Sequence, residues 1–286
     1  MESVKAFIRE FASVWQRLVF TAVAIYLFFV YNTIYSIRAL SLLSIPLLVL
    51  FAIFQALVLL VGFCYFRMVI AKNCTTLELF PDLEEQGHES SSESLHLNPF
   101  EEENLTTQEK SVNICLICKT TKPPRSYHCI DCNRCLLMMY KHSRWFDVCI
   151  GFTNYKFYVV LLFYSGLLCS LSIGSFIYGL ATMFGRLWVF IPVLIALVLQ
   201  SFMALVIVWE MYQAITCILE NKTLEERKDP TMDKNITYDL GRKENWRMIM
   251  GDTWYLWFLP VWSTSGNGLK YTINRKTLDQ SSQGDE

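Results

Sequence analysis

Residues 115–149 read CLICKTTKPPRSYHCIDCNRCLLMMYKHSRWFDVC, and this stretch decides the fold. It holds six of the ten cysteines in the 286-residue chain and two of its four histidines. These candidate metal ligands are Cys115, Cys118, His128, Cys129, Cys132, Cys135, His142 and Cys149. Cysteines two residues apart can close on one tetrahedral zinc ion, and sets of four Cys and His form structural zinc sites. Eight ligands therefore predict two closed zinc sites.

Neither buried core cysteines nor a redox pair fits this pattern as well as zinc does. Scattered core cysteines would not show this regular spacing, and a redox Cys-x-x-Cys pair would leave four of the six cysteines without a role. The segment also has little aliphatic content before Leu136, too little for a core of its own. Metal binding must then supply the stability, and removing the metal is expected to unfold the segment.

Long apolar stretches lie on both sides of this segment. Residues 18–37, 39–66, 157–185 and 187–209 contain no Asp, Glu, Lys or Arg. Each is long enough to cross a bilayer, which takes about 20 helical residues. Each is also apolar on all sides, unlike a helix of a soluble domain that meets water on one face. We therefore predict four transmembrane helices, and the absence of charge within them disfavours a channel or transporter.

The charges predict the orientation. Of 25 Lys and Arg residues, three precede residue 18, ten lie in 67–156 and ten follow Tyr212. By the positive-inside rule, both termini and the long middle loop are expected to face the cytosol, with the first span retained as an anchor. Because the cytosol is reducing, the loop cysteines should be thiols or metal ligands. A net charge of -1 argues against a nucleic-acid partner.

The composition predicts six consecutive regions. The acidic linker is marked by ten acidic residues against one basic residue in 75–111. The predicted regions are a cytosolic N-terminus (1–17), two transmembrane helices (18–66), the acidic linker (67–111), a cysteine-rich domain (112–156), two more transmembrane helices (157–212) and a cytosolic tail (213–286).

Several motifs in this order resemble those of the DHHC-type protein S-acyltransferases, membrane enzymes that move palmitate from acyl-CoA to cytosolic cysteine thiols. The resemblance is carried by the eight Cys and His positions and by Pro124, Arg125, Trp145, Gly151, Asn154 and Phe157. It continues in Lys222-Thr223-Leu224-Glu225, similar to a TTxE element, and in Tyr238-Asp239-Leu240-Gly241 with Asn245-Trp246.

The resemblance implies an all-α polytopic membrane protein of the endoplasmic reticulum or Golgi, with a cytosolic zinc-stabilised domain between the second and third helices. It also implies how the ligands are shared. The first zinc would be held by Cys115, Cys118, His128 and Cys135, and the second by Cys129, Cys132, His142 and Cys149. Ligands that alternate along the chain in this way would interlock the two sites.

The sequence departs from the family in its signature tetrapeptide. Where family members have Asp-His-His-Cys, this chain has Tyr140, Lys141, His142 and Ser143, followed by Arg144 in place of Pro. The family's nucleophile is the Cys. A serine hydroxyl ionises far less readily than a thiol with a pKa of about 8.5, and a lysine with a pKa of about 10.4 is a poor base at neutral pH. The chemical groups are therefore altered although all eight zinc ligands are kept.

Two functions remain as hypotheses. In the first, Ser143 carries an acyl group as an oxyester, assisted by Lys141 and Tyr140, while Arg144 and Lys156 meet the phosphates of acyl-CoA. In the second, the protein is a pseudoenzyme, a zinc-stabilised membrane scaffold that binds acyl-CoA, a cytosolic or membrane substrate protein, or an active relative. In both, Thr223, Glu225 and Asn245 are expected to hold the tail against the rest of the protein.

Overall fold

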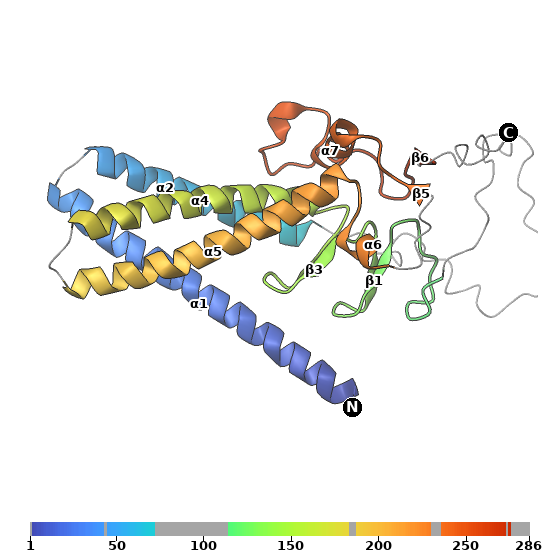
Figure 1. The fold of residues 1–286 in the computed structure, drawn as a ribbon, viewed down its shortest axis with the longest axis horizontal. Helices are drawn as coiled ribbons and strands as arrows, with labels where there is room; N and C mark the ends of the chain where they lie inside the picture. The colour runs from blue at the N-terminus through green and yellow to red at the C-terminus, as the bar shows by residue number, and fades with distance from the viewer. Residues whose placement is uncertain are drawn as a thin grey trace, which may run out of the picture.

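Four long helices form the bundle that dominates the molecule (Figure 1). The computed structural model describes residues 2–42, 45–71, 114–182, 187–229, 236–272 and 274–275. The bundle helices are α1 (Glu2–Leu42), α2 (Ile45–Ile70), α4 (Tyr155–Thr182) and α5 (Leu187–Leu219). Each contains a segment long and apolar enough to span a membrane, so the predicted four-span architecture is confirmed.

Two helix ends differ from the sequence-based expectation. Helix α1 continues past Ile37 to Leu42, and α5 continues ten residues past Trp209. A span predicted from composition stops at its first charge, whereas a helix needs only satisfied backbone hydrogen bonds to continue. As a consequence Glu210, which follows the charge-free stretch 187–209, lies within the candidate span of α5.

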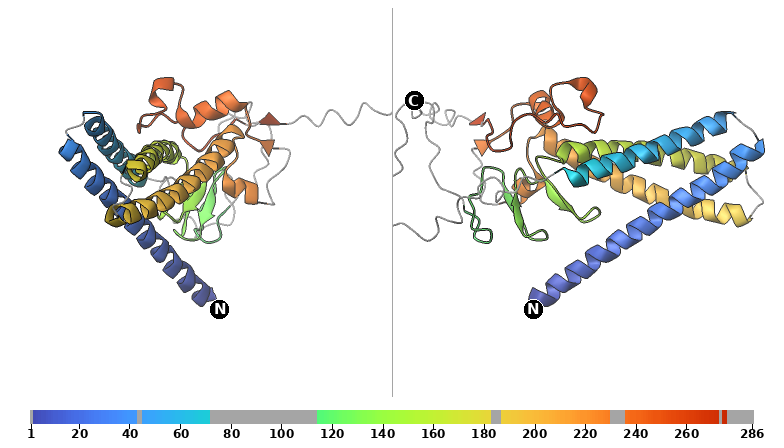
Figure 2. Two further views of the ribbon diagram at one scale, coloured as in Figure 1. Left: turned by 60° about the vertical axis from the view of Figure 1, so that its left-hand side comes forward. Right: turned by 180° about the vertical axis from the view of Figure 1, so that it is seen from behind.

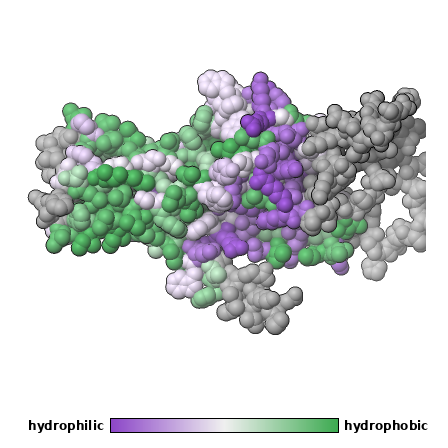
Figure 3. Space-filling view, in the orientation of Figure 1, coloured by the Kyte–Doolittle hydropathy of each residue, from purple (hydrophilic) through white to green (hydrophobic). Residues whose placement is uncertain are grey.

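The cysteine-rich module, residues 114–154, sits at the end of the bundle where α2 ends and α4 begins (Figure 1). It contains two antiparallel hairpins that the all-α prediction did not include. The first pairs β1 (Tyr127–Cys129) with β2 (Arg134–Leu136), and the second pairs β3 (Lys141–Ser143) with β4 (Val148–Ile150). The surface is largely apolar over the bundle and hydrophilic over much of the module end (Figure 3).

Asn154 and Gly151 attach the module to the bundle. The buried amide of Asn154 donates to the carbonyls of Cys149 (2.9 Å) and Met68 (3.3 Å) and accepts from Gly151 N (2.9 Å). A Cβ on Gly151 would approach the carbonyl oxygen of Leu137 to 2.9 Å. Any larger residue at this position would therefore require the backbone to move. These contacts fix the second hairpin against the ends of α2 and α4.

The C-terminal segment folds back beside the module (Figure 2). It contains α6 (Leu224–Lys228), β5 (Ile236–Thr237), α7 (Arg242–Met250), the short helix η4 (Trp254–Leu256) and β6 (Asn274–Arg275). The fully buried amide of Asn245 donates to Leu219 O (2.8 Å) and accepts from Leu240 N (3.0 Å), which ties α7 to the end of α5. Most of the predicted acidic linker, 67–111, lies outside the described residues.

Candidate metal centres and the altered reaction centre

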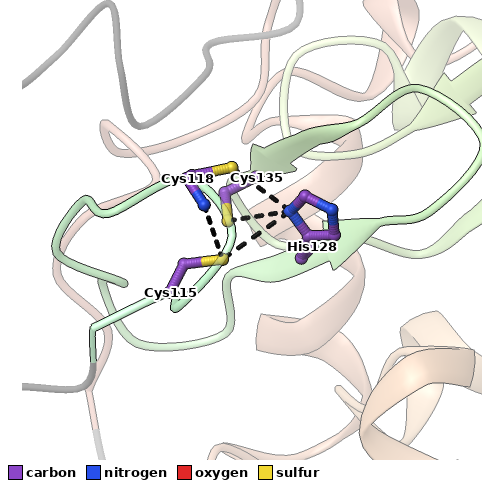
Figure 4. A group of neighbouring side chains, drawn as sticks. All are labelled: Cys115, Cys118, His128 and Cys135. Carbon is purple, nitrogen blue, oxygen red and sulfur yellow. Dashed lines mark hydrogen bonds between the residues drawn. The ribbon is translucent and has the colours of Figure 1, made fainter.

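The first metal centre brings together Cys115, Cys118, His128 and Cys135 (Figure 4). The Nδ1 atom of His128 lies 3.6, 3.2 and 3.7 Å from the sulfurs of Cys115, Cys118 and Cys135. A tetrahedral zinc with bonds of about 2.3 Å to sulfur and 2.0 Å to nitrogen requires a sulfur–nitrogen separation of about 3.5 Å. These four atoms therefore have the spacing that a bound zinc ion needs.

The second metal centre brings together Cys129, Cys132, His142 and Cys149. Its three sulfurs lie 3.5–3.7 Å from His142 Nδ1, and the sulfurs of Cys132 and Cys149 are 3.2 Å apart. Hydrogen bonds from Cys132 and Cys149 hold the pKa of Cys129 far below its ordinary range.

The hairpins explain why these ligands meet. The strand register places His128 opposite Cys135 and His142 opposite Cys149, so each hairpin presents one imidazole and one thiol side by side. The other two ligands of each site come from a Cys-x-x-Cys turn. In each turn the second cysteine's N–H points to the first sulfur, at 3.5 Å in Cys115–Cys118 and 3.4 Å in Cys129–Cys132. Since Cys129 and Cys132 belong to the first hairpin, that hairpin contributes to both sites.

A carboxylate supports the second centre from outside. The Nε2 atom of His142 lies 3.5 Å from Asp147 Oδ1, while Nδ1 faces the sulfurs. Carboxylates commonly orient metal-bound histidines in this way. Asp147 also forms an ion pair with Arg17, so it connects the second metal centre to helix α1. The role of Asp147 was not predicted, because its position in the hairpin turn becomes apparent only from the pairing of β3 with β4.

Lys141, at the altered tetrapeptide, is engaged in an ion pair. Its ammonium group donates to Glu210 Oε2 on α5, and the same oxygen accepts from the Tyr158 hydroxyl at 2.8 Å. The two paired side chains are 15% and 16% exposed. The ammonium also lies 5.5 Å from the ring centre of Tyr140 and 5.6 Å from that of Tyr158. A carboxylate and two aromatic rings thus surround the amine of Lys141.

Tyr140 and Ser143 are both buried. Tyr140 is fully buried and stacks on Tyr155, with ring centres 4.6 Å apart; burial raises the pKa of its phenol well above the ordinary value. Ser143 is 3% exposed. Its nearest sequence neighbours offer no base, because Lys141 is paired with Glu210 and His142 Nδ1 faces the metal ligands.

A cavity of about 530 Å³ lies inside the bundle. All four long helices line it, and Trp145, Phe146, Tyr158 and Glu210 lie at its module end. The remaining lining is mostly apolar and extends to Phe176 in α4. This volume is within the range of about 300–1,000 Å³ that holds one small molecule.

The chain is similar to known palmitoyltransferases over the region that holds both metal centres. Residues 108–230 match the model of the DHHC palmitoyltransferase family. Residues 108–230 thus carry the domain of the DHHC palmitoyltransferase family. It is 30% identical over 190 residues to palmitoyltransferase ZDHHC20 of Homo sapiens, covering 61% of this chain and 50% of that protein. It is 29% identical over 217 residues to palmitoyltransferase PFA3 of Debaryomyces hansenii, covering 62% and 52%. The chain thus spans about half the length of these relatives.

The TTxE-like element, residues 222–225, is held in place through Glu226, a residue that the sequence analysis did not single out. Thr223 caps α6 by accepting from Glu226 N at 3.1 Å, and Glu226 Oε2 accepts from Thr223 N at 2.7 Å. Glu225, which was expected to help hold the tail against the rest of the protein, instead pairs with Lys228 at the surface. The signal was present, because Thr-x-x-Glu is the capping-box spacing and it joins Thr223 to Glu226, not to Glu225.

Glu226 also links the tail to the module through Arg125. Arg125 donates to Glu226 Oε1 (2.6 Å) and Oε2 (3.1 Å), and both side chains are 1% exposed. It further donates to Asn221 Oδ1 (2.8 Å) and lies 4.7 and 4.9 Å from the ring centres of Tyr238 and Tyr271. Every face of the guanidinium is therefore occupied, as the burial of a charge requires.

Of the two residues expected to meet CoA phosphates, only one is accessible. Arg144 is exposed, whereas Lys156 is 1% exposed and donates to Leu256 O (2.8 Å) and Ser263 Oγ in the tail. The ammonium of Lys156 therefore does not face a phosphate site, contrary to the prediction. The sequence could not reveal this, because the segment that covers Lys156 lies about 100 residues later in the chain.

Proposed function

We propose that the protein is a DHHC palmitoyltransferase family member in which acyl transfer is impaired or absent. In this proposal it acts as a zinc-stabilised scaffold that holds an acyl chain at an endoplasmic reticulum or Golgi membrane, with its module and termini in the cytosol. The ion pair of Lys141 with Glu210 is the observation that carries the proposal. A general base must reach the proton that it accepts, and the amine of Lys141 is instead engaged with the carboxylate of Glu210.

The nucleophile supports the same conclusion. A Ser hydroxyl needs an adjacent base to attack a thioester. Of the two residues before Ser143, Lys141 is paired with Glu210 and His142 belongs to the second metal centre. An oxyester on Ser143 would also be less reactive toward a client thiol than the family's thioester. Both acyl loading and acyl transfer are therefore expected to be slow or absent.

The cavity supports retention of a bound chain. Its lining residues extend about 15 Å along α5, from Gln200 to Glu210, and about 27 Å along α4, from Tyr158 to Phe176. One leaflet of a bilayer, which an acyl chain spans, is about 15 Å thick. We expect acyl-CoA, a substrate protein or an active relative to be the partner, and two structural zinc ions to hold the module in place.

Restoring the tetrapeptide tests the proposal. Purified wild-type protein and the triple variant Tyr140→Asp, Lys141→His and Ser143→Cys are incubated with fluorescent palmitoyl-CoA. We expect no label on the wild type and a label on the triple variant that neutral hydroxylamine removes, because that reagent cleaves thioesters and largely spares oxyesters. A version that also carries Glu210→Gln removes the carboxylate left behind by Lys141.

The control is Ser143→Ala. The proposal is wrong if the wild type acquires an acyl group that neutral hydroxylamine spares, if that label is absent from Ser143→Ala, and if it passes to a client thiol. Zinc is measured on every variant, so that a loss of folding is not mistaken for a loss of chemistry.

A further inference from the structure

The polar end of the bundle cavity has a distinct chemical character. Among the lining residues, all of them in the described part of the chain, Glu210 alone carries a formal charge. Its Oε2 accepts from Lys141 and Tyr158. A carboxylate has about four lone-pair sites, so this one retains acceptor capacity, including its second oxygen.

The charged group of the lining and its nearest charged neighbours are paired. Lys141 supplies one positive charge and Glu210 one negative charge, and the next ion pair, Arg17 with Asp147, is balanced as well. A second anion would be repelled by Glu210, and a second cation would leave an uncompensated charge in a largely apolar surrounding. The site is therefore best matched by a neutral group.

Several further polar groups of the lining are occupied within their own helices. The hydroxyls of Thr21 and Ser172 donate to carbonyls one turn earlier, at 2.8 Å to Arg17 O and 2.8 Å to Leu168 O. Gln200 lies ten residues before Glu210 on α5, about 15 Å deeper in the bundle. Glu210 is thus the acceptor that a ligand's head would meet at the module end.

The shape of the cavity fits a single chain. The volume of about 530 Å³ is within the range of about 300–1,000 Å³ that holds one small ligand, and the lining extends about 15 Å along α5, as an extended acyl chain requires.

We propose that the cavity binds a single-chain lipid whose neutral, hydroxyl-bearing head donates a hydrogen bond to Glu210. The inference rests on the proposed function, that the bundle holds an acyl chain, and it names the chemical class of that lipid. A palmitoyl thioester has only acceptor atoms at the same position, so it cannot make this bond. The altered centre would then select a monoacylglycerol or a long-chain alcohol over acyl-CoA.

Competition in phosphatidylcholine nanodiscs tests this selectivity. A fluorescent 16-carbon probe is displaced by five competitors of equal chain length: 1-monopalmitoylglycerol, hexadecanol, methyl palmitate, hexadecylamine and palmitoyl-CoA. We expect the two hydroxyl lipids to displace the probe at concentrations at least about tenfold lower than the other three, since a hydrogen bond to a charged group contributes about 1.5–3 kcal/mol.

Two variants localise the effect. The double variant Lys141→Met and Glu210→Leu removes both charges together and should bind all five competitors within about threefold of one another. The matched control Gln200→Leu, deeper in the same cavity, should keep the wild-type preference. Zinc content and thermal melting of both variants establish that they are folded.

The outcomes separate this inference from the proposed function. If the probe does not bind to folded protein, the cavity holds no chain and the proposed function fails. If the probe binds but methyl palmitate, palmitoyl-CoA or hexadecylamine competes as well as hexadecanol, the head-group inference alone is overturned. The same holds if Gln200→Leu abolishes the preference and the double variant keeps it.

Discussion

The two faces of strand β3 serve different sites: one face contributes a metal ligand, and the other carries residues of the tetrapeptide that differs from the family's. His142, in the middle of the strand, points to the second metal centre, while its neighbours Lys141 and Ser143 occupy the altered reaction positions. Successive side chains of a strand alternate between faces, so three consecutive residues can serve two separate environments. The metal-binding face carries two ligands of the hairpin, His142 and, opposite it, Cys149, whereas on the other face Lys141 forms an ion pair with α5. One short strand therefore joins a metal centre to the bundle.

The largest expected effect comes from removing the metal. Chelation, or the substitution Cys129→Ser, should unfold the cysteine-rich module, because zinc binding contributes about 10–16 kcal/mol in small zinc domains. Hydrogen exchange should show lost protection over β1–β4 and retained protection in α4 and α5. Cys169→Ser, a buried cysteine of α4 outside both centres, is the control and should keep two zinc ions per chain. Retained protection of the hairpins after complete metal removal would contradict the dependence on metal.

A smaller effect is expected from the buried ion pair that joins module and tail. Arg125→Ala should destabilise the protein by about 3–5 kcal/mol, because it leaves Glu226 buried without a partner. The control is Arg227→Ala, which breaks an exposed pair with Glu220 and should cost less than about 1 kcal/mol. Unfolding in mixed detergent micelles measures both. Equal losses in the two variants would show that the tail contributes little to the stability of the module.

The smallest effect is expected at Tyr140. Its hydroxyl is buried without a hydrogen-bond partner of standard geometry in the described part of the chain, so Tyr140→Phe should change stability at pH 7 by no more than about 0.5 kcal/mol. Burial raises the pKa of the folded phenol, so its contribution is intact below the unfolded pKa of about 10 and is lost as pH rises above it. Tyr140→Phe should therefore lose less stability than the wild type above pH 10. A large loss at pH 7 would instead indicate a hydrogen bond that stabilises the fold.

The sequence predicts features that depend on short spacing or on composition. The four spans and the presence of two metal sites fall in this class, since a Cys-x-x-Cys pair or a long apolar stretch is visible without the fold. The division of the ligands between the two sites came from the family resemblance. Contacts between distant segments could not be predicted. Glu210 meets Lys141 across 69 residues, and Arg125 meets Glu226 across 101. The burial of Lys156 escapes prediction for the same reason, because its covering segment is equally remote.

The C-terminal tail supplies the hydrogen-bond acceptors for the buried ammonium group of Lys156. Its ammonium has carbonyl and hydroxyl acceptors from residues 256 and 263, with Ser263 in turn donating to Met250 O. A polypeptide that stopped after α7 would leave this positive charge facing apolar side chains at the head of α4. The four-helix bundle therefore depends on the C-terminal tail, because the buried ammonium at the start of α4 gains its hydrogen-bond acceptors only when residues 256 and 263 are in place.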